Sequence, residues 1–212
     1  MDMRIAGSGN IPPGTYDKVT VRGSGRLYGE ITCDAFTASG SVKGESILCT
    51  ERFKTSGRAA FSGKINAKSV RASGTLACGS DLVAKEEVSV SGTLRVGGNT
   101  EAARVHVTGS MQCTGALLAE HVELQADSAM HAHRVRGAQI LMKRKRVSIF
   151  LKRGVSVTEA IEGDTLILEH VTCPRVTGRA VTIGKGCKID LVQYSEKIEL
   201  SPKATVEKIE KI

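Results

Sequence analysis

Val70-Arg-Ala72-Ser-Gly74, Val88-Ser-Val90-Ser-Gly92 and Val105-His-Val107-Thr-Gly109 are three copies of one short phrase, and this phrase decides the fold. Each copy joins an alternating apolar triplet, which is typical of a strand, to a tight corner that ends in glycine. A phrase that returns at a fixed interval indicates a stack of similar structural units rather than a single globular core.

The repeat extends in both directions from this stretch. Upstream copies end at Gly23, Gly40 and Gly57, so the glycines recur every 17 or 18 residues. Such a unit is too short for a strand, a crossover helix and a return strand, but it can hold three short strands joined by tight corners. Successive windings then lie about 4.8 Å apart and pair in parallel. We therefore predict an all-β fold, a right-handed parallel β-helix (β-solenoid) with about 17 residues per turn.

The alternation within the repeat separates an inward from an outward set of side chains. Residues between the apolar positions, such as Arg71, Ser89, His106 and Glu123, should face water. The positions expected to stack inside the solenoid are Val19, Val21, Phe36, Ala38, Phe53, Val70, Ala72, Val88, Val90, Val105, Val107, Val122 and Leu124.

Changes of rhythm divide the chain into four segments. Residues 1–14 contain three glycines and two prolines and are expected to form an irregular N-terminal arm. Residues 15–137 are expected to form β-helix turns, residues 138–154 a basic loop or enlarged turn, and residues 155–212 further turns that continue to the C-terminus.

The net charge of +8 favours an acidic partner, such as an anionic membrane surface or an acidic protein. Cations concentrate in the third segment, where they flank a short apolar stretch. This segment is expected either to bind such a partner or to form a solvated edge. Its candidate binding residues are Lys143, Arg144, Lys145, Arg146, Phe150, Lys152 and Arg153.

No catalytic, metal or cofactor motif stands out. The six cysteines form no CxxC pair and are expected to be buried and reduced, although Cys33 and Cys49 could stack in neighbouring turns. His131 and His133 are a weak candidate metal pair. We expect no cofactor, no metal, no small-molecule substrate and no nucleic-acid partner.

One enzyme family remains as an alternative. Ile183-Gly-Lys-Gly-Cys187-Lys-Ile189 looks like one unit of the hexapeptide acyltransferases. A true member would carry an aliphatic residue at every sixth position through many turns, and this chain has the motif once. The protein is therefore not expected to be an enzyme.

Nothing in the first residues resembles a signal peptide, and no stretch approaches the roughly 20 apolar residues that a membrane span needs. We expect a cytoplasmic protein, with association to a membrane surface left open.

The chain resembles the bactofilins, a family of polymer-forming bacterial cytoskeletal proteins, in a longer variant. The resemblance covers nearly the whole sequence. It rests on the Val-x-Val-Ser-Gly phrases and, in the last third, on Ile161-Glu-Gly-Asp164, Val176-Thr-Gly178, Val181-Thr-Ile-Gly-Lys-Gly-Cys187 and Val192-Gln-Tyr194. It implies a β-helix that assembles end to end into filaments without nucleotide and serves as a scaffold in cell shape, cell-wall placement or motility.

A solenoid without capping elements exposes unpaired strand edges at both ends. We therefore expect a homopolymer whose contacts lie in or next to the end turns, at Val19 and Val21 on one side and at Ile198, Leu200 and Val206 on the other. The alternative is a monomeric adaptor that binds an anionic membrane or an acidic protein through its basic segment.

Overall fold

A computed structural model describes residues 1–144 and 154–212. Every regular element in these ranges is a β-strand, and the strands form one sheet in which each pairs in parallel with the next. The strands are β1 (Met3–Ile11), β2 (Gly14–Leu27), β3 (Glu30–Gly44), β4 (Ser46–Phe61), β5 (Ile65–Cys78), β6 (Leu82–Val96), β7 (Thr100–Arg144), β8 (Val155–Leu168), β9 (Val171–Ile183), β10 (Lys188–Leu200) and β11 (Thr205–Lys211).

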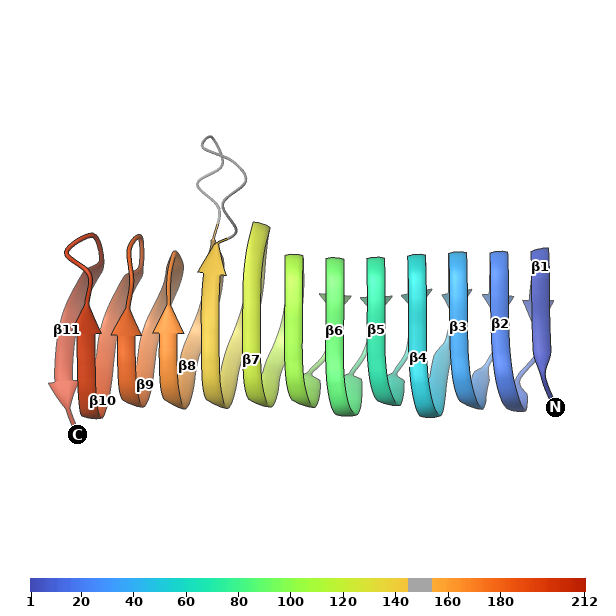
Figure 1. The fold of residues 1–212 in the computed structure, drawn as a ribbon, viewed down its shortest axis with the longest axis horizontal. Helices are drawn as coiled ribbons and strands as arrows, with labels where there is room; N and C mark the ends of the chain where they lie inside the picture. The colour runs from blue at the N-terminus through green and yellow to red at the C-terminus, as the bar shows by residue number, and fades with distance from the viewer. Residues whose placement is uncertain (145–153) are drawn as a thin grey trace.

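The chain winds around one long axis, with its N- and C-termini at opposite ends (Figure 1). Most strands curve around a large part of a turn, and β7, with 45 residues, passes through more than two turns. The pairing register places each repeat glycine directly beside the next, from Gly23 to Gly40 and onward to Gly92 and Gly109. The predicted β-solenoid with about 17 residues per turn is confirmed.

The repeat glycines form one corner column, and the geometry of that column requires glycine. Gly74 has φ of 109° and Gly92 has φ of 127°, a region that residues with a Cβ rarely adopt. A Cβ on Gly74 would also collide with the carbonyl oxygen of Gly57 in the preceding turn. The glycine period thus fixes the corner at which each turn of the first half bends.

All thirteen positions predicted to face inward are buried. Phe36 and Phe53 stack with their ring centroids 5.0 Å apart, and Phe61 packs edge-on against both rings. In the neighbouring inward column, Thr55 lies between Ala38 and Ala72, and its buried hydroxyl has no hydrogen-bond partner.

The six cysteines are buried and form no disulfide, as predicted. Cys33 and Cys49 are register partners, and their Sγ atoms lie 3.5 Å apart. Burial raises the pKa of Cys173 to about 11, and it also raises the pKa of Cys78 and Cys113. These thiols therefore stay protonated at neutral pH and serve as small apolar side chains.

The prediction of an irregular arm over residues 1–14 is wrong. Residues 3–11 form β1, which pairs with β2 from Met3–Val19 to Ile11–Leu27. Gly7 takes the place of a repeat glycine opposite Gly23, with φ of 91°. The glycines and prolines of this segment mark corners of a first turn that has the same form as the following ones.

The basic loop or enlarged turn predicted for residues 138–154 lies only in part within the described residues. Residues 138–144 continue β7, and Ile140 and Met142 in this stretch are buried in the core. Residues 145–153 lie outside the described part of the chain. From Val155 the strands resume with β8, as expected for the last segment.

Candidate functional site

The two end turns differ from the others because each has only one neighbouring turn. The sheet runs from β1 to β11 without closing, so β1 and β11 are its edge strands. Within residues 1–144 and 154–212, no segment covers the outer edge of either strand. Unpaired N–H and C=O groups on such edges are able to bind a further strand.

The N-terminal end presents the outer edge of β1. Met3 and Ile5 pack against the core from one side only and are partly buried. Val19 and Val21 lie one turn further in, directly beneath Met3 and Ile5, and are 0% exposed. They therefore lie next to the N-terminal end turn, which β1 forms, and their part in a contact between copies stays a prediction.

The C-terminal end has an uncovered stretch in two strands. β11 pairs with β10 only from Lys188 to Tyr194, so the last part of β10, Lys197–Leu200, pairs with β9 alone. Leu200 is 45% exposed and Ile209 is 43% exposed, although both belong to columns that are buried elsewhere. Ile198, Leu200 and Val206 are thus placed at this end, as predicted.

Charged side chains at the C-terminal end neutralise one another. Lys197 lies 2.6 Å from Glu199, and Lys208 lies 2.6 Å from Glu210. Hydrogen bonds from these lysines hold the pKa of Glu199 and Glu210 below the usual range. The end therefore carries close ion pairs rather than a patch of one sign.

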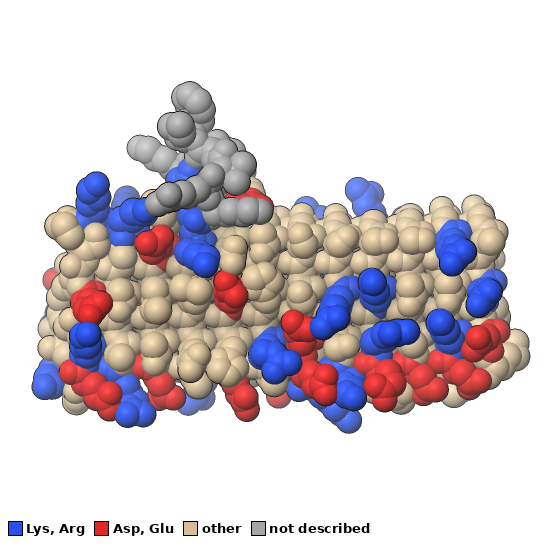
Figure 2. Space-filling model, viewed as in Figure 1, with Lys and Arg blue, Asp and Glu red and all other residues tan. Residues whose placement is uncertain are grey.

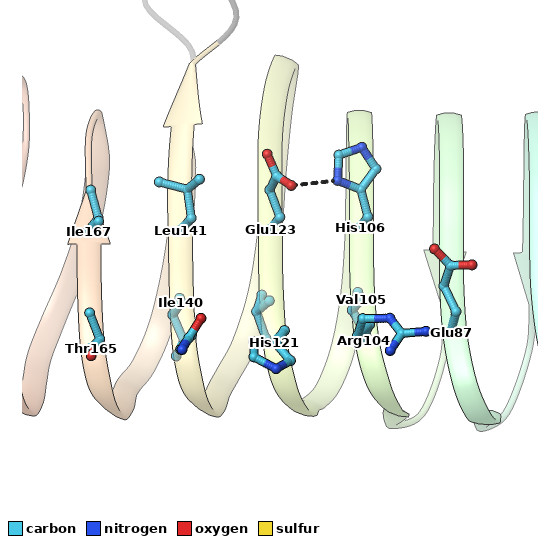
Figure 3. A pocket seen from close by; sticks show the side chains of 12 residues that line it. Glu87, Arg104, Val105, His106, His121, Glu123, Ile140, Leu141, Thr165 and Ile167 are labelled. Atoms are coloured by element: carbon cyan, nitrogen blue, oxygen red, sulfur yellow. Dashed lines mark hydrogen bonds and ion pairs between the residues drawn. The ribbon is translucent and has the colours of Figure 1, made fainter.

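A shallow groove of about 520 Å³ crosses the side of the solenoid over β6, β7 and β8 (Figure 3). Glu123 lies at its centre. His106 Nδ1 lies 3.1 Å from Glu123 Oε2, and Gln125 Nε2 donates to Glu123 Oε1 over 2.6 Å. Leu141 and Ile167 continue the same outward row towards the C-terminus.

The contacts of Glu123 suit a structural role. The Gln125 hydrogen bond, followed by the charges of His106 and Lys143, lowers the pKa of Glu123. A carboxylate with a lowered pKa is a poor general base at neutral pH. The row from His106 to Lys143 instead links three successive turns through one carboxylate.

Only two residues of the predicted basic site are described. Lys143 Nζ lies 3.7 Å from Glu123, and Arg144 lines a recess of about 560 Å³ together with His131, His170 and Lys188. Lys145, Arg146, Phe150, Lys152 and Arg153 lie outside the described residues.

One histidine of the suggested metal pair, His133, has other partners. His133 Nε2 lies 3.1 Å from Glu159, and His133 Nδ1 lies 3.0 Å from the hydroxyl of Thr158. Among the described residues, no three His, Cys, Asp or Glu side chains are grouped as a metal site would require. The same residues contain no helix that could cross a membrane.

The hexapeptide-like motif forms a single corner. Gly186 has φ of 71°, and a Cβ at this position would collide with the ring of His170 in the preceding turn. His170 itself adopts φ of 54°, which is unusual for a residue with a side chain. The glycines of this motif therefore have a local packing role.

Comparison with known proteins gives one partial similarity. The chain is 32% identical over 82 residues to the uncharacterized protein YhbF of Bacillus subtilis (strain 168). The match covers 39% of this chain and 35% of that protein. No family model and no solved structure matches the sequence.

Proposed function

We propose that the protein is a structural scaffold that assembles end to end into filaments without bound nucleotide. The observation that supports this proposal is that two open strand edges lie at opposite ends of one solenoid, each with uncovered apolar side chains. A contact between such ends does not close on itself, so it repeats without limit.

The two ends carry the same local pattern as the interior. At one end Met3-Arg-Ile5 has two inward apolar residues around an outward charged one, and Ile198-Glu-Leu200 repeats this arrangement at the other. Inside the solenoid, equivalent triplets stack like on like and are fully covered. Another copy at either end would bury these residues in the manner of an interior turn.

The favourable terms of end-to-end association are comparable in size to its cost. End-to-end pairing would form about six to nine backbone hydrogen bonds, each worth about 1 kcal/mol net. Burial of the apolar end residues adds about 25 cal/mol for each Å² removed from water. The opposing cost of association is roughly 4–15 kcal/mol. The ion pairs at the C-terminal end reduce the repulsion between copies.

The resemblance of the repeat phrases to those of bactofilins points in the same direction, since members of that family polymerise through their β-helices. We accordingly propose a cytoplasmic, non-enzymatic scaffold whose main partner is another copy of itself. Association with a membrane surface is a further element of this proposal.

A matched pair of substitutions tests the proposal. Leu200 at the end and Ile167 on the side are aliphatic residues with nearly equal exposure, 45% and 44%. We expect the unmodified protein and Ile167→Lys to sediment as filaments, and Leu200→Lys to remain as single subunits. At the other end, Ile5→Lys is the suitable variant, because a charge at Val21 would lie inside the core. Filaments of the Leu200→Lys protein under the same conditions would reject this contact.

The adaptor remains a second candidate, favoured by the recess that Arg144 and Lys188 line near the basic segment. Replacing Lys143, Arg144, Lys145 and Arg146 with glutamine separates the two functions. Loss of binding to acidic vesicles with filaments intact would support the adaptor function. Unchanged binding would leave the scaffold as the remaining candidate function.

A further inference from the structure

A cluster of cations on the side of the N-terminal turns stands apart from the rest of the surface. A depression of about 480 Å³ over β1 to β4 is lined by Arg4, Lys18, Arg22, Arg52 and Lys54, and by no carboxylate. Figure 2 shows Lys and Arg side chains at this end of the rod, while Asp and Glu side chains gather along its lower edge.

The register explains how residues distant in sequence form this cluster. Arg4, Thr20, Thr37 and Lys54 follow one another in a single outward column. Lys18 and Arg52 belong to the outward column on one side of it, with Ala35 between them in the intervening turn. Arg22 belongs to the column on its other side. Because turns are about 4.8 Å apart, the column from Arg4 to Lys54 spans about 15 Å. The cations therefore surround two threonine hydroxyls.

These cations have no acidic partner, unlike several other cations on the surface, which form ion pairs. In the described part of the chain, none of the five takes part in an ion pair. Two nearby acidic groups have other partners: Asp17 lies 2.7 Å from the N-terminal amine, and Asp34 accepts a hydrogen bond from Thr50. Asp2, near Arg4, is an exposed carboxylate outside the lining of the depression. One turn beyond the cluster, Arg71 pairs with Glu87 at 3.0 Å.

Five like charges within about two Debye lengths repel one another, so an anion bound among them would relieve this repulsion. Arginine binds phosphate through two parallel hydrogen bonds, and lysine and threonine supply additional donors. The volume of the depression suits a small ligand rather than a folded domain. Charges that are spread from the first to the fourth turn exceed what one phosphate would contact.

We propose that this cluster is a binding site for an anion that carries two or more linked phosphate groups, either free in solution or exposed on a lipid headgroup. The site lies on the side of the solenoid, so it is independent of the proposed end-to-end contact. Arg4, Arg22 and Arg52 bind phosphate oxygens, while Thr20 and Thr37 donate hydroxyl hydrogen bonds at the centre.

Isothermal titration with inorganic tripolyphosphate tests this proposal, with orthophosphate and sulfate at equal ionic strength as comparisons. The variant Arg52→Gln/Lys54→Gln removes two cluster cations. The control Lys64→Gln/Lys68→Gln removes the same charge from lysines that pair with Asp81 and with Glu51 and Glu86. Thermal unfolding checks that both variants are folded.

We expect tripolyphosphate to bind at least tenfold more tightly than sulfate, the cluster variant to weaken binding at least tenfold, and the control to change it less than twofold. Phosphatidylcholine vesicles with and without a polyprenyl diphosphate, a lipid whose headgroup has two linked phosphates, form a second arm. Binding that appears only with the diphosphate lipid, and only with the cluster intact, assigns the phosphates to a lipid surface. Equal weakening by both variants, equal affinity for sulfate, or no binding in either arm would overturn the proposal.

Discussion

An interior turn and an end turn of this solenoid contain the same kinds of residues but differ in what covers them. Leu94 in β6 is 0% exposed between two neighbouring turns, whereas Leu200 in β10 is 45% exposed beside one. Val21 and Ile5 show the same contrast at the other end. The apolar side chains of a turn are thus covered by the turns on both sides of it. In the described end turns, no other segment covers the side that lacks a neighbouring turn.

The largest difference in stability between substitutions in an interior turn and in an end turn is expected at the corner glycines. Gly74→Ala should destabilise the protein by about 2–6 kcal/mol, because the positive φ costs about 1–3 kcal/mol and the collision with the Gly57 carbonyl adds a similar amount. Gly7 has φ of 91° but nothing within 4 Å of an added Cβ, so Gly7→Ala should cost only the first part. Denaturant unfolding of both variants measures the difference. Equal losses would show that the end corner is as crowded as an interior one.

Truncation of leucine gives the next contrast. Leu94→Ala should lower the free energy of unfolding by about 2–5 kcal/mol, because it leaves a cavity in a closed core. Leu200→Ala should cost less than about 1 kcal/mol in the monomer, since nearly half of this side chain is already in water. Unfolding at a protein concentration too low for assembly provides both values. A large loss from Leu200→Ala would mean that the C-terminal end is more tightly packed than its exposure indicates.

Two buried threonines offer a contrast within the interior. Thr55 has a hydroxyl without a partner, so Thr55→Val should stabilise the protein by about 1–2 kcal/mol. The Thr100 hydroxyl lies 3.6 Å from Cys113 Sγ, so Thr100→Val removes a partner and should bring little gain. A thermal melt of each variant is sufficient. A higher midpoint for Thr100→Val than for Thr55→Val would contradict this account.

The smallest effect concerns acid stability. The pKa of Glu123 is held low by Gln125, His106 and Lys143, so its contribution is present above the unfolded pKa of about 4.3 and is lost as the pH falls through the folded value. Glu123→Gln should therefore reduce the loss of stability below about pH 4.3, by less than about 1 kcal/mol because the carboxylate is 37% exposed. Glu199→Gln, at the solvated end, should change the acid profile less. Unfolding measured from neutral pH to pH 3 compares them.

Much of the interior could be predicted from the sequence, because a period of 17 or 18 residues and an alternation of two determine which side chains stack. The N-terminal turn was missed because its glycines and prolines were interpreted as irregular. A signal was nevertheless present: Met3-Arg-Ile5 has the form of Val19-Thr-Val21, and Gly7 precedes Gly23 by nearly one period.

The candidate sites were less accessible to sequence reasoning. The position of Leu200 at an end followed from its place in the last repeats, but the end residues near the N-terminus shifted by one turn once β1 was found. The cation cluster was missed because Arg4, Arg22 and Arg52 are far apart in sequence and meet only through the register. A continuous run such as Lys143–Arg146 is visible in the sequence, whereas a cluster built from several turns is not.

Electron cryomicroscopy of the purified, unmodified protein tests the central claim most directly. Stacked ends predict filaments one solenoid wide in which the spacing of about 4.8 Å between turns continues across every junction between subunits. A field of separate rods, each one subunit long at concentrations well above those in a cell, would contradict the claim that the two ends bind further copies.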